Sequence, residues 1–425
     1  MLNTLKSYIG GRNPIRILWH RSKGLLAALW YGFPAKKVHV IGITGTDGKT
    51  TTVGMTAHIL SQNDIRCGAL STAFVRIGDT EEWNETQKTS PSPFVIQRFL
   101  RDCKKAKCTH AVLECSSHGL VQGRLTLLLP SVAGITNISK EHLDYHGTMD
   151  QYVKDKSILF KMLRKRGRKV LNRDDQTFES YSSIRTIHTV SYSVTSTDAT
   201  LSVSQVQLWP LGCSAIVHSE DDDNSAELKL SIPGEFNIEN ALCAIGCTSG
   251  SVRLTDACKA LESFTGVPGR MESIDEGQKF SVFVDFTVTP AAYEKTLLTL
   301  RKMIEPGKRI LVLTGSCGDR MKEKRPVVGA LCSTLADVVV VTNEDPYTED
   351  PQAIIDEVWA GVDQSACKAT KIFDRKEAIQ WILKEAQEGD TVILCAKGSD
   401  TTMWVADGQI PWNEREVTRE FLKSL

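Results

Sequence analysis

The sequence predicts an α/β protein whose parallel sheets are covered by helices, and three observations support this fold class. Short apolar runs alternate with helix-like stretches from residue 38 onward. The first run leads into a glycine-rich loop and then a helix-like stretch. Residues 197–232 differ, because polar and apolar residues alternate there. We expect a P-loop-type central domain with a mostly parallel sheet and a small antiparallel insert, followed by a Rossmann-like C-terminal domain.

The expected strands are short apolar runs, and helix-like stretches lie between several of them. The runs are 38–43, 110–113, 132–136, 169–171, 281–284, 310–313, 338–341 and 391–395. The expected helices are 53–60, 93–103, 149–163, 290–303 and 351–358. Parallel strands need long crossover connections, so this alternation indicates parallel sheets.

The loop after the first strand is typical of a site for nucleotide phosphates. It reads Gly45-Thr46-Asp47-Gly48-Lys49-Thr50-Thr51. Glycines let backbone N–H groups approach phosphates, and the following helix adds the positive end of its dipole. Lys49 can reach the terminal phosphates, and Thr50 can bind Mg²⁺. Ile43 stands where the usual motif has its first glycine, so an ordinary glycine-rich turn is the alternative.

Composition narrows the class of protein. The 425 residues suggest two or three domains. Lys+Arg and Asp+Glu are both 51, which argues against a general nucleic-acid or membrane-surface binder. The 12 cysteines form no C-x-x-C pair, and we expect reduced core residues of a cytoplasmic protein. No run of about 18 apolar residues is present, so no transmembrane segment is expected.

Three parts are expected along the chain: an amphipathic arm (1–37), a central nucleotide-binding domain (38–266) and a second α/β domain (267–425). The boundary lies in the Gly- and Pro-containing stretch 265–270. The arm mixes Trp and Leu with Arg and Lys, which favours packing or substrate contact over membrane contact. The insert contains an acidic turn at 220–224. A cleft between the two α/β domains is the expected active site.

Polar residues gather where expected strands end. Glu114 ends the 110–113 strand, where open α/β sheets place their sites, and it can hold a metal or cap a helix. His142 and His146 flank Asp144 after the 132–136 strand, which suits metal or phosphate chemistry as well as a structural role. Lys156 follows on the next helix.

These segments together resemble the Mur ligase family over about residues 38 to 425. The matching strings are 45–50, 114–118, 136–147, 236–241, 267–272, 285–290, 318–320 with 324–326, 344–351, and 410–417. The strings SSHGL (116–120) and HLDYHG (142–147) look most like the MurE type. The resemblance implies ATP-driven amide formation: a carboxylate attacks the γ-phosphate, and an amine then displaces phosphate from the acyl phosphate. The implied small-molecule substrates are a UDP-N-acetylmuramoyl-dipeptide-like acceptor and an amino acid, in peptidoglycan precursor biosynthesis.

The resemblance also implies roles for individual residues. Lys49 stabilises charge on the transferring phosphoryl group. Thr50 and Glu114 resemble ligands of one Mg²⁺ and His142 a ligand of a second. Lys156 matches a lysine carried as a metal-binding carbamate, against the alternative of a solvated helix lysine. Residues resembling nucleotide contacts are Asn237 and Asn240 at adenine, Asp285 at ribose and Arg270 at the hinge. Residues on the acceptor or amino-acid side are Thr89, Ser90, Ser116, Ser117, His118, Arg320, Tyr347, Lys397 and Asp400.

The chain departs from the family pattern at several positions. Asp47 replaces the usual Asn, and Val288 replaces a His of the D-Y-A-H-x-P string. Tyr347 replaces the Arg of the D-N-P-R string, and Ser399-Asp400 replaces His-Glu. Arg can clamp a second carboxylate in a fork that Tyr cannot copy, so we predict that meso-diaminopimelate is not the amine. The acids Glu344, Asp345 and Asp400 favour a cationic side chain such as lysine or ornithine.

Other functions stay open at the level of sequence. Only 37 residues precede the first strand, so we expect no separate UDP-binding domain. The acceptor could then be folate-like, as in a folylpolyglutamate-synthase-like ligase. A partner protein is also possible, as in a Mur-like subunit of an amidotransferase complex, although no zinc-ribbon cysteine pairs are present. A non-catalytic nucleotide-binding module is the remaining alternative.

Overall fold

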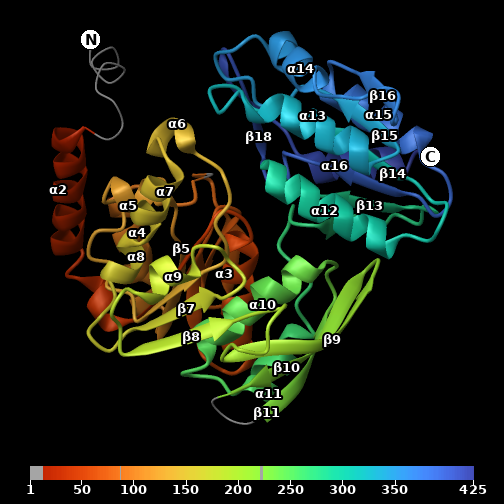
Figure 1. Cartoon of the computed structure of the whole chain (residues 1–425). Helices are drawn as coiled ribbons and strands as arrows, with labels where there is room; N and C mark the ends of the chain where they lie inside the picture. The colour runs from red at the N-terminus through yellow and green to blue at the C-terminus, as the bar shows by residue number, and fades with distance from the viewer. Residues whose placement is uncertain (1–12, 87, 221–223) are drawn as a thin grey trace. The chain divides into compact units, whose positions relative to one another are not determined.

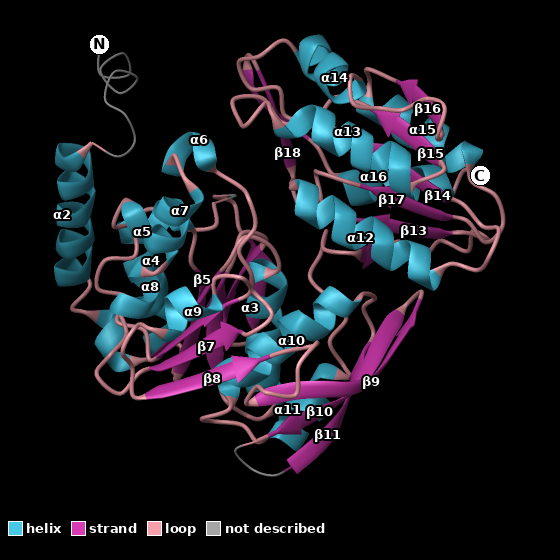
Figure 2. Cartoon of the chain, viewed as in Figure 1, coloured by secondary structure: helices cyan, strands magenta, loops and turns pink. Residues whose placement is uncertain are grey.

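The computed structural model describes residues 13–86, 88–220 and 224–425, and their contacts divide the chain into two units. Unit 1 comprises Met1–Val206, Ser214–Leu230 and Phe236–Phe264. Unit 2 comprises Gln207–Cys213, Ser231–Glu235 and Thr265–Leu425. The α/β fold class predicted from the sequence is confirmed, and each unit is built on a sheet of its own (Figure 2).

The larger sheet has eleven strands in the order β11-β10-β9-β8-β7-β6-β1-β5-β2-β3-β4. Its strands are β1 (His39–Thr44), β2 (Cys67–Leu70), β3 (Phe74–Ile77), β4 (Thr80–Trp83), β5 (His110–Glu114), β6 (Val132–Ile135), β7 (Arg168–Asn172), β8 (His188–Tyr192), β9 (Leu201–Trp209), β10 (Gly212–Ser219) and β11 (Asn224–Leu230). Strand β1 lies between β5 and β6 and runs parallel to both. Five successive residues of β1 are buried, which requires cover on both faces.

Helices supply that cover (Figure 1). The helices are α2 (Pro14–Trp30), η1 (Pro34–Lys37), α3 (Lys49–Gln62), α4 (Pro93–Lys105), α5 (Ser117–Val121), α6 (Leu143–His146), α7 (Met149–Lys156), α8 (Ile158–Lys161), α9 (Phe178–Ser182), α10 (Glu235–Thr248) and α11 (Leu254–Leu261). Both α3 and α4 contact β2 and β5. Because β1 leads directly into α3, the loop between them stands at the carboxyl edge of the parallel strands.

The predicted insert is a continuation of the main sheet. Strand β9 pairs in parallel with β8 where Leu201 lies opposite Tyr192, and β10 and β11 follow outward. Two residues join β9 to β10, so these neighbours run antiparallel. At the opposite edge, β3 and β4 form an antiparallel pair that the sequence patterns did not indicate. Residues 221–223 of the acidic turn lie outside the described residues.

Unit 2 holds a six-stranded sheet in the order β12-β13-β17-β14-β15-β16. Its elements are β12 (Glu272–Ser273), β13 (Ser281–Val284), α12 (Pro290–Met303), β14 (Ile310–Thr314), α13 (Lys324–Leu335), β15 (Val338–Val341), α14 (Pro351–Trp359), β16 (Lys368–Lys371), α15 (Arg375–Glu385), β17 (Thr391–Leu394) and α16 (Glu414–Leu422). All neighbouring pairs are parallel except β12 with β13. A separate hairpin of β18 (Thr402–Val405) and β19 (Gly408–Pro411) follows β17.

Two local features differ from the expected elements. The expected helix 149–163 is divided into α7 and α8 at Ser157, whose hydroxyl donates to the carbonyl of Lys154 at 2.7 Å. Such a bond competes with helix hydrogen bonds. All twelve cysteines are free, and all except Cys317 and Cys367 are buried, as predicted for reduced core residues. No helix within the described ranges has the length and hydrophobicity needed to cross a bilayer.

Candidate active site

The loop from Gly45 to Gly48 has a backbone that requires glycine at both ends. Gly45 has φ 144°, and a Cβ there would lie 1.9 Å from Thr136 Oγ1. Gly48 has φ 78°, and its Cβ would lie 2.2 Å from Asn240 Oδ1. Side chains are strained in this region of φ and have no room at either position. Helix α3 begins at the next residue, Lys49, so its free N–H groups face the end of the loop.

The loop is held in place by the segment after β6. The Asp47 amide donates to Asn137 Oδ1 at 3.0 Å, and the Asp47 carbonyl accepts from Thr136 Oγ1 at 2.6 Å. The Asp47 carboxylate accepts a bond from Ser139 Oγ at 3.3 Å. The backbone of Asp47 is therefore fixed by the side chains of Asn137 and Thr136, which follow β6.

Glu114 is the center of a second set of contacts, at the carboxyl end of β5. Its Oε2 accepts from Thr50 Oγ1 at 3.0 Å and from both the amide and the hydroxyl of Thr72, at 2.7 and 2.9 Å. Lys49 Nζ lies 4.0 Å from Glu114 Oε1 and donates to the Thr46 carbonyl at 2.7 Å. The structure thus brings the predicted residues Lys49, Thr50 and Glu114 together.

Lys156 is buried beside the same loop. Its Nζ donates to the Gly45 carbonyl at 2.6 Å and lies 4.5 Å from the center of the Tyr152 ring. Burial lowers the pKa of Lys156 well below the ordinary lysine value, and the charge of Lys49 lowers it further. A solvated helix lysine is therefore not what the structure contains at this position. Tyr152 also contacts Thr46, through its hydroxyl at 3.2 Å.

These residues fit a magnesium ion in part. The Thr50 hydroxyl and the Glu114 carboxylate are adjacent oxygen donors, which is the donor type that Mg²⁺ prefers. The ring of His142 instead lies 4.8 Å from that of His118 and 6.5 Å from that of Tyr152. Within the described ranges, no three or more His, Cys, Asp or Glu side chains are grouped as a metal site.

A chain of three buried polar side chains connects α5, α6 and α7. His146 Nδ1 lies 2.5 Å from Asp155 Oδ2, and His146 Nε2 lies 3.0 Å from Ser117 Oγ. The rings of His118 and Tyr145 lie 5.3 and 4.9 Å from the His146 ring. Asp155 directly precedes Lys156, so this chain fixes the helix that carries the buried lysine.

The segments 89–92 and 116–118 also meet. Ser90 Oγ accepts from the Ser116 amide at 3.0 Å and donates to the Glu114 carbonyl at 3.3 Å. Thr89 Oγ1 lies 2.9 Å from Thr72 Oγ1, the hydroxyl that also contacts Glu114. These predicted acceptor-side residues therefore surround the end of β5 that holds Glu114.

The predicted adenine-side residues lie on α10. Asn240 Oδ1 accepts from Thr52 Oγ1 at 3.3 Å, and Asn240 Nδ2 donates to Asn237 Oδ1 at 3.2 Å. Both asparagines are buried. The hydrogen bond with Thr52 connects Asn240 to the first turn of α3, which follows Gly48.

In unit 2, Arg270 and Asp285 are neighbours. Asp285 accepts a bond from the Met271 amide at 2.7 Å and one from the Thr287 hydroxyl. The Arg270 guanidinium lies 4.2 Å from the center of the Phe286 ring. Loss of water around Asp285 raises the pKa of its carboxyl, while Thr287 and Arg270 act in the opposite direction.

Arg320 and Tyr347, both predicted on the amino-acid side, are in contact. The Arg320 guanidinium lies 5.4 Å from the center of the Tyr347 ring, which stacks on Trp404 at 5.5 Å. Tyr347 has φ 51°, a left-handed conformation that is uncommon for aromatic residues. The residue that replaces the family's Arg thus contacts both a cation and an indole.

Lys397 is buried among carboxylates. Its Nζ lies 2.7 Å from Asp345 Oδ1 and 3.2 Å from Asp400 Oδ2. Burial acts to lower the pKa of Lys397, but the charges of Asp400 and Asp345 outweigh it and raise that pKa. Burial raises the pKa of Glu344 to about 7, with the charge of Asp345 adding to the effect. Two of the three acids expected to attract a cationic substrate are therefore already paired with Lys397.

Three contacting residues were missing from the predicted site. Thr72 holds Glu114, Asn137 holds the phosphate loop, and Arg124 donates to the Ser90 carbonyl at 2.7 Å. Thr72 and Asn137 follow β2 and β6 directly, so the rule that sites form where parallel strands end would have found both. Arg124 had no comparable signal.

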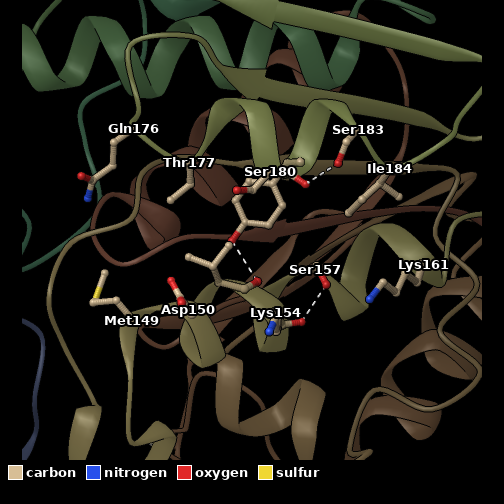
Figure 3. Close-up of a pocket in the computed structure, with 12 residues that line it drawn as sticks. Met149, Asp150, Lys154, Ser157, Lys161, Gln176, Thr177, Ser180, Ser183 and Ile184 are labelled. Atoms are coloured by element: carbon tan, nitrogen blue, oxygen red, sulfur yellow. Dashed lines mark hydrogen bonds between the residues drawn. The ribbon is translucent and has the colours of Figure 1, made fainter.

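A separate hollow is lined by residues of α7 and α9 (Figure 3). Its lining includes Asp150 and Lys154 from α7, and Ser157, which directly follows α7. Ser180 from α9 and Ser183, which directly follows α9, also line it. Lys156 and Tyr152, on the same helix, do not line it. None of the predicted site residues lines this hollow.

Comparisons with known proteins identify the family to which the chain is similar. A family model described as Mur ligase middle domain matches residues 43–248, and one described as Mur ligase, glutamate ligase domain matches residues 269–398. A UDP-N-acetylmuramoyl-L-alanyl-D-glutamate--2,6-diaminopimelate ligase from Geobacillus thermodenitrificans is 33% identical over 95% of this chain and 82% of that protein. A UDP-N-acetylmuramyl-tripeptide synthetase from Roseiflexus sp. is 34% identical over 94% and 81%.

Solved structures show the same relationship. A UDP-N-acetylmuramoyl-L-alanyl-D-glutamate--2,6-diaminopimelate ligase matches with a TM-score of 0.64 and 28% identity, over 91% of this chain and 78% of that one. MurF ligase from Thermotoga maritima in complex with ADP has a TM-score of 0.69 over 94% and 83%, and at 19% identity it shows likeness of fold alone. With both family models matched and a third of the residues shared with MurE-type relatives over nearly its whole length, the chain belongs to the Mur ligase family of ATP-dependent ligases.

Proposed function

We propose that this protein joins the amine of an amino acid to the carboxylate of a UDP-N-acetylmuramoyl-dipeptide-type acceptor, with cleavage of ATP to ADP and phosphate. The observation that carries the proposal is the contact set of Lys49, Thr50 and Glu114 around the loop, in a chain 33% identical to a named MurE-type ligase. The acceptor carboxylate attacks the γ-phosphorus of ATP, the bond to ADP breaks, and an acyl phosphate forms. The amine then attacks the acyl carbon, loses a proton and expels phosphate.

The residues of unit 1 suit the phosphoryl step. Loop amides and the N-terminus of α3 suit anionic phosphate oxygens, and Lys49 adds a positive charge there. Thr50 and Glu114 would hold Mg²⁺, which would offset charge on the phosphates. Thr72 positions Glu114 from the other side through its two hydrogen bonds.

We also propose that Lys156 reacts with CO₂ and carries a carbamate. Its burial favours the neutral amine, which is the form that attacks CO₂ with loss of one proton. A carbamate in this place supplies an anionic oxygen, which with His142 completes the proposed site for a second Mg²⁺. The test is rescue of Lys156→Ala by short carboxylic acids, with Lys154→Ala as the control from the exposed face of α7. No rescue, together with no ¹³C-bicarbonate signal in the unmodified protein, contradicts the carbamate.

The amine remains predicted as one other than meso-diaminopimelate, although several relatives are named as 2,6-diaminopimelate ligases. Tyr347, which stacks on Trp404 and contacts Arg320, has no guanidinium fork of its own for a second carboxylate. Lys397 already pairs with Asp345 and Asp400, which leaves Glu344, ionised only above about pH 7, as the acid that supports a cationic side chain. Tyr347→Arg is expected to shift preference toward meso-diaminopimelate, measured as the ratio of kcat/KM values for the two amines.

The deciding experiment measures phosphate release from Mg-ATP with UDP-N-acetylmuramoyl-L-Ala-D-Glu and a panel of amino acids. Release that needs both substrates, with a product heavier by one amino-acid residue in the mass spectrum, is the expected result. Lys49→Ala is expected to abolish it, while Lys36→Ala, an exposed lysine outside the loop, should not. If folate-type acceptors or an added amidotransferase partner are required instead, the proposed acceptor is wrong. Tight ATP binding without turnover on any acceptor would contradict catalysis altogether.

A further inference from the structure

An ordinary surface helix buries its large apolar side chains, but helix α2 exposes them. Its small residues Gly24, Ala27 and Ala28 are buried against the protein, and a Cβ on Gly24 would lie 2.6 Å from Thr126 Cβ. Its large apolar residues face outward and are between 48% and 79% exposed. These are Ile15, Leu18, Trp19, Leu25, Leu26, Leu29 and Trp30.

The outward residues form one continuous face, which we call the α2 apolar face. Positions 15, 18, 19, 26, 29 and 30 repeat with the spacing of a single helix side, and residue 25 lies at its margin. Helix α2 contacts α4 on its other side, and Figure 1 shows it at the margin of unit 1. Its 17 residues make a helix about 25 Å long. Burying these side chains inside the unit would have been favourable, so their exposure requires another explanation.

Charge indicates what covers this face. Residues 1–46 contain no Asp or Glu, although the whole chain has 51 of them. Arg21 and Lys23 lie near the middle of α2, and Lys23 Nζ lies 4.9 Å from the center of the Trp19 ring. Lys36 and Lys37 are exposed on η1 just beyond it. A basic helix with exposed Trp and Leu matches a bilayer interface that carries anionic lipids.

Pairing with a second copy fits less well. Two α2 apolar faces brought together would join two helices that each carry Arg21 and Lys23 and have no acid to balance them. We therefore propose that α2 docks the protein on an anionic membrane surface, lying in the interface with Trp19 and Trp30 among the lipid headgroups. The balanced net charge of the chain conceals this local excess of positive charge.

The test is flotation of the full chain with vesicles of phosphatidylglycerol and phosphatidylcholine, against vesicles of phosphatidylcholine alone. Binding to the anionic vesicles is expected, with a blue shift of tryptophan fluorescence and loss of binding at high salt. Leu18→Glu/Leu26→Glu is expected to weaken binding at least tenfold. Leu211→Glu is the matched control, because Leu211 is 56% exposed but lies in the β9–β10 turn.

The contrary outcomes are distinct. Equal binding of the double variant and the unmodified chain, or no flotation at low salt, overturns the proposal. A concentration-dependent dimer that the same double variant dissociates, without vesicle binding, assigns the α2 apolar face to contact between copies instead. Circular dichroism of the double variant shows whether it folds, and Arg21→Ala/Lys23→Ala tests the charges without adding acids to the face.

Discussion

Glu344 shows how one buried carboxyl sets a pH dependence. Its pKa is about 7 in the folded protein against an ordinary value of 4.5, so the folded state keeps a proton that the unfolded chain releases. Stability therefore falls as pH rises from about 4.5, and the loss is complete above about 7. Glu344→Gln should raise the free energy of unfolding at pH 8 by about 1–3 kcal/mol, and by much less at pH 5. Urea unfolding at the two pH values measures this.

Glu349 provides a matched control with the opposite sign. Arg325 donates to both of its carboxylate oxygens at 3.0 Å and lowers the pKa of Glu349 to about 2. This ion pair stabilises the fold above pH 4.5, and its contribution is lost as pH falls toward 2. Glu349→Gln should destabilise the protein at neutral pH. A gain in stability there would contradict the ion pair.

The Ser117–His146–Asp155 chain predicts an effect on turnover. His146→Ala should lower kcat about 10–100-fold while KM for ATP changes little, because Asp155 then no longer fixes the helix position of Lys156. His188→Ala, at an exposed histidine of β8, serves as the control. Rescue by His146→Gln, which can keep one of the two bonds, supports a positioning role. An unchanged kcat in His146→Ala contradicts it.

Among the elements, the turn before α3 has the least tolerance for change. Gly48→Ala should weaken ATP binding, because the left-handed backbone costs about 1–2 kcal/mol and the Cβ meets Asn240 Oδ1 at 2.2 Å. Gly307→Ala is the control outside the loop, since Gly307 has φ 84° with no atom within 4 Å of its Cβ and carries only the backbone cost. Calorimetric titration with ATP should detect a loss for Gly48→Ala alone.

Sequence patterns predicted those strands and helices whose ends are marked by residues within the element itself. Strands β13 and β15 and helix α12 have the predicted bounds, because compact apolar runs or Pro290 mark their ends. Strands β3 and β4 were missed since β4 is exposed along its length and has no apolar run. The predicted site residues were chosen because they stand in sequence motifs that resemble those of the Mur ligase family. Thr72 and Glu114 are 42 residues apart and meet because β2 and β5 are neighbours in the sheet. A short sequence motif carries no information about which strands become neighbours.

For the whole molecule, two separate cores predict two unfolding transitions. One core includes Leu100 on α4, and the other includes Leu383 on α15. Leu100→Ala and Leu383→Ala should each lower a different transition in a calorimetric scan, by about 2–5 kcal/mol of stability. If both substitutions lower a single shared transition equally, the two units unfold as one.

The antiparallel strands at both ends of the large sheet have a consequence for engineering. If β2 ended the sheet, its unpaired backbone groups would lie beside buried apolar side chains, and such apolar edges promote aggregation, whereas β4 is exposed along its length. Here β9–β11 and β3–β4 occupy those ends. Deleting residues 197–232 would shorten the protein but remove β9, β10 and β11, which cover the edge of β8. We expect the shortened protein to aggregate, because β8 would then end the sheet.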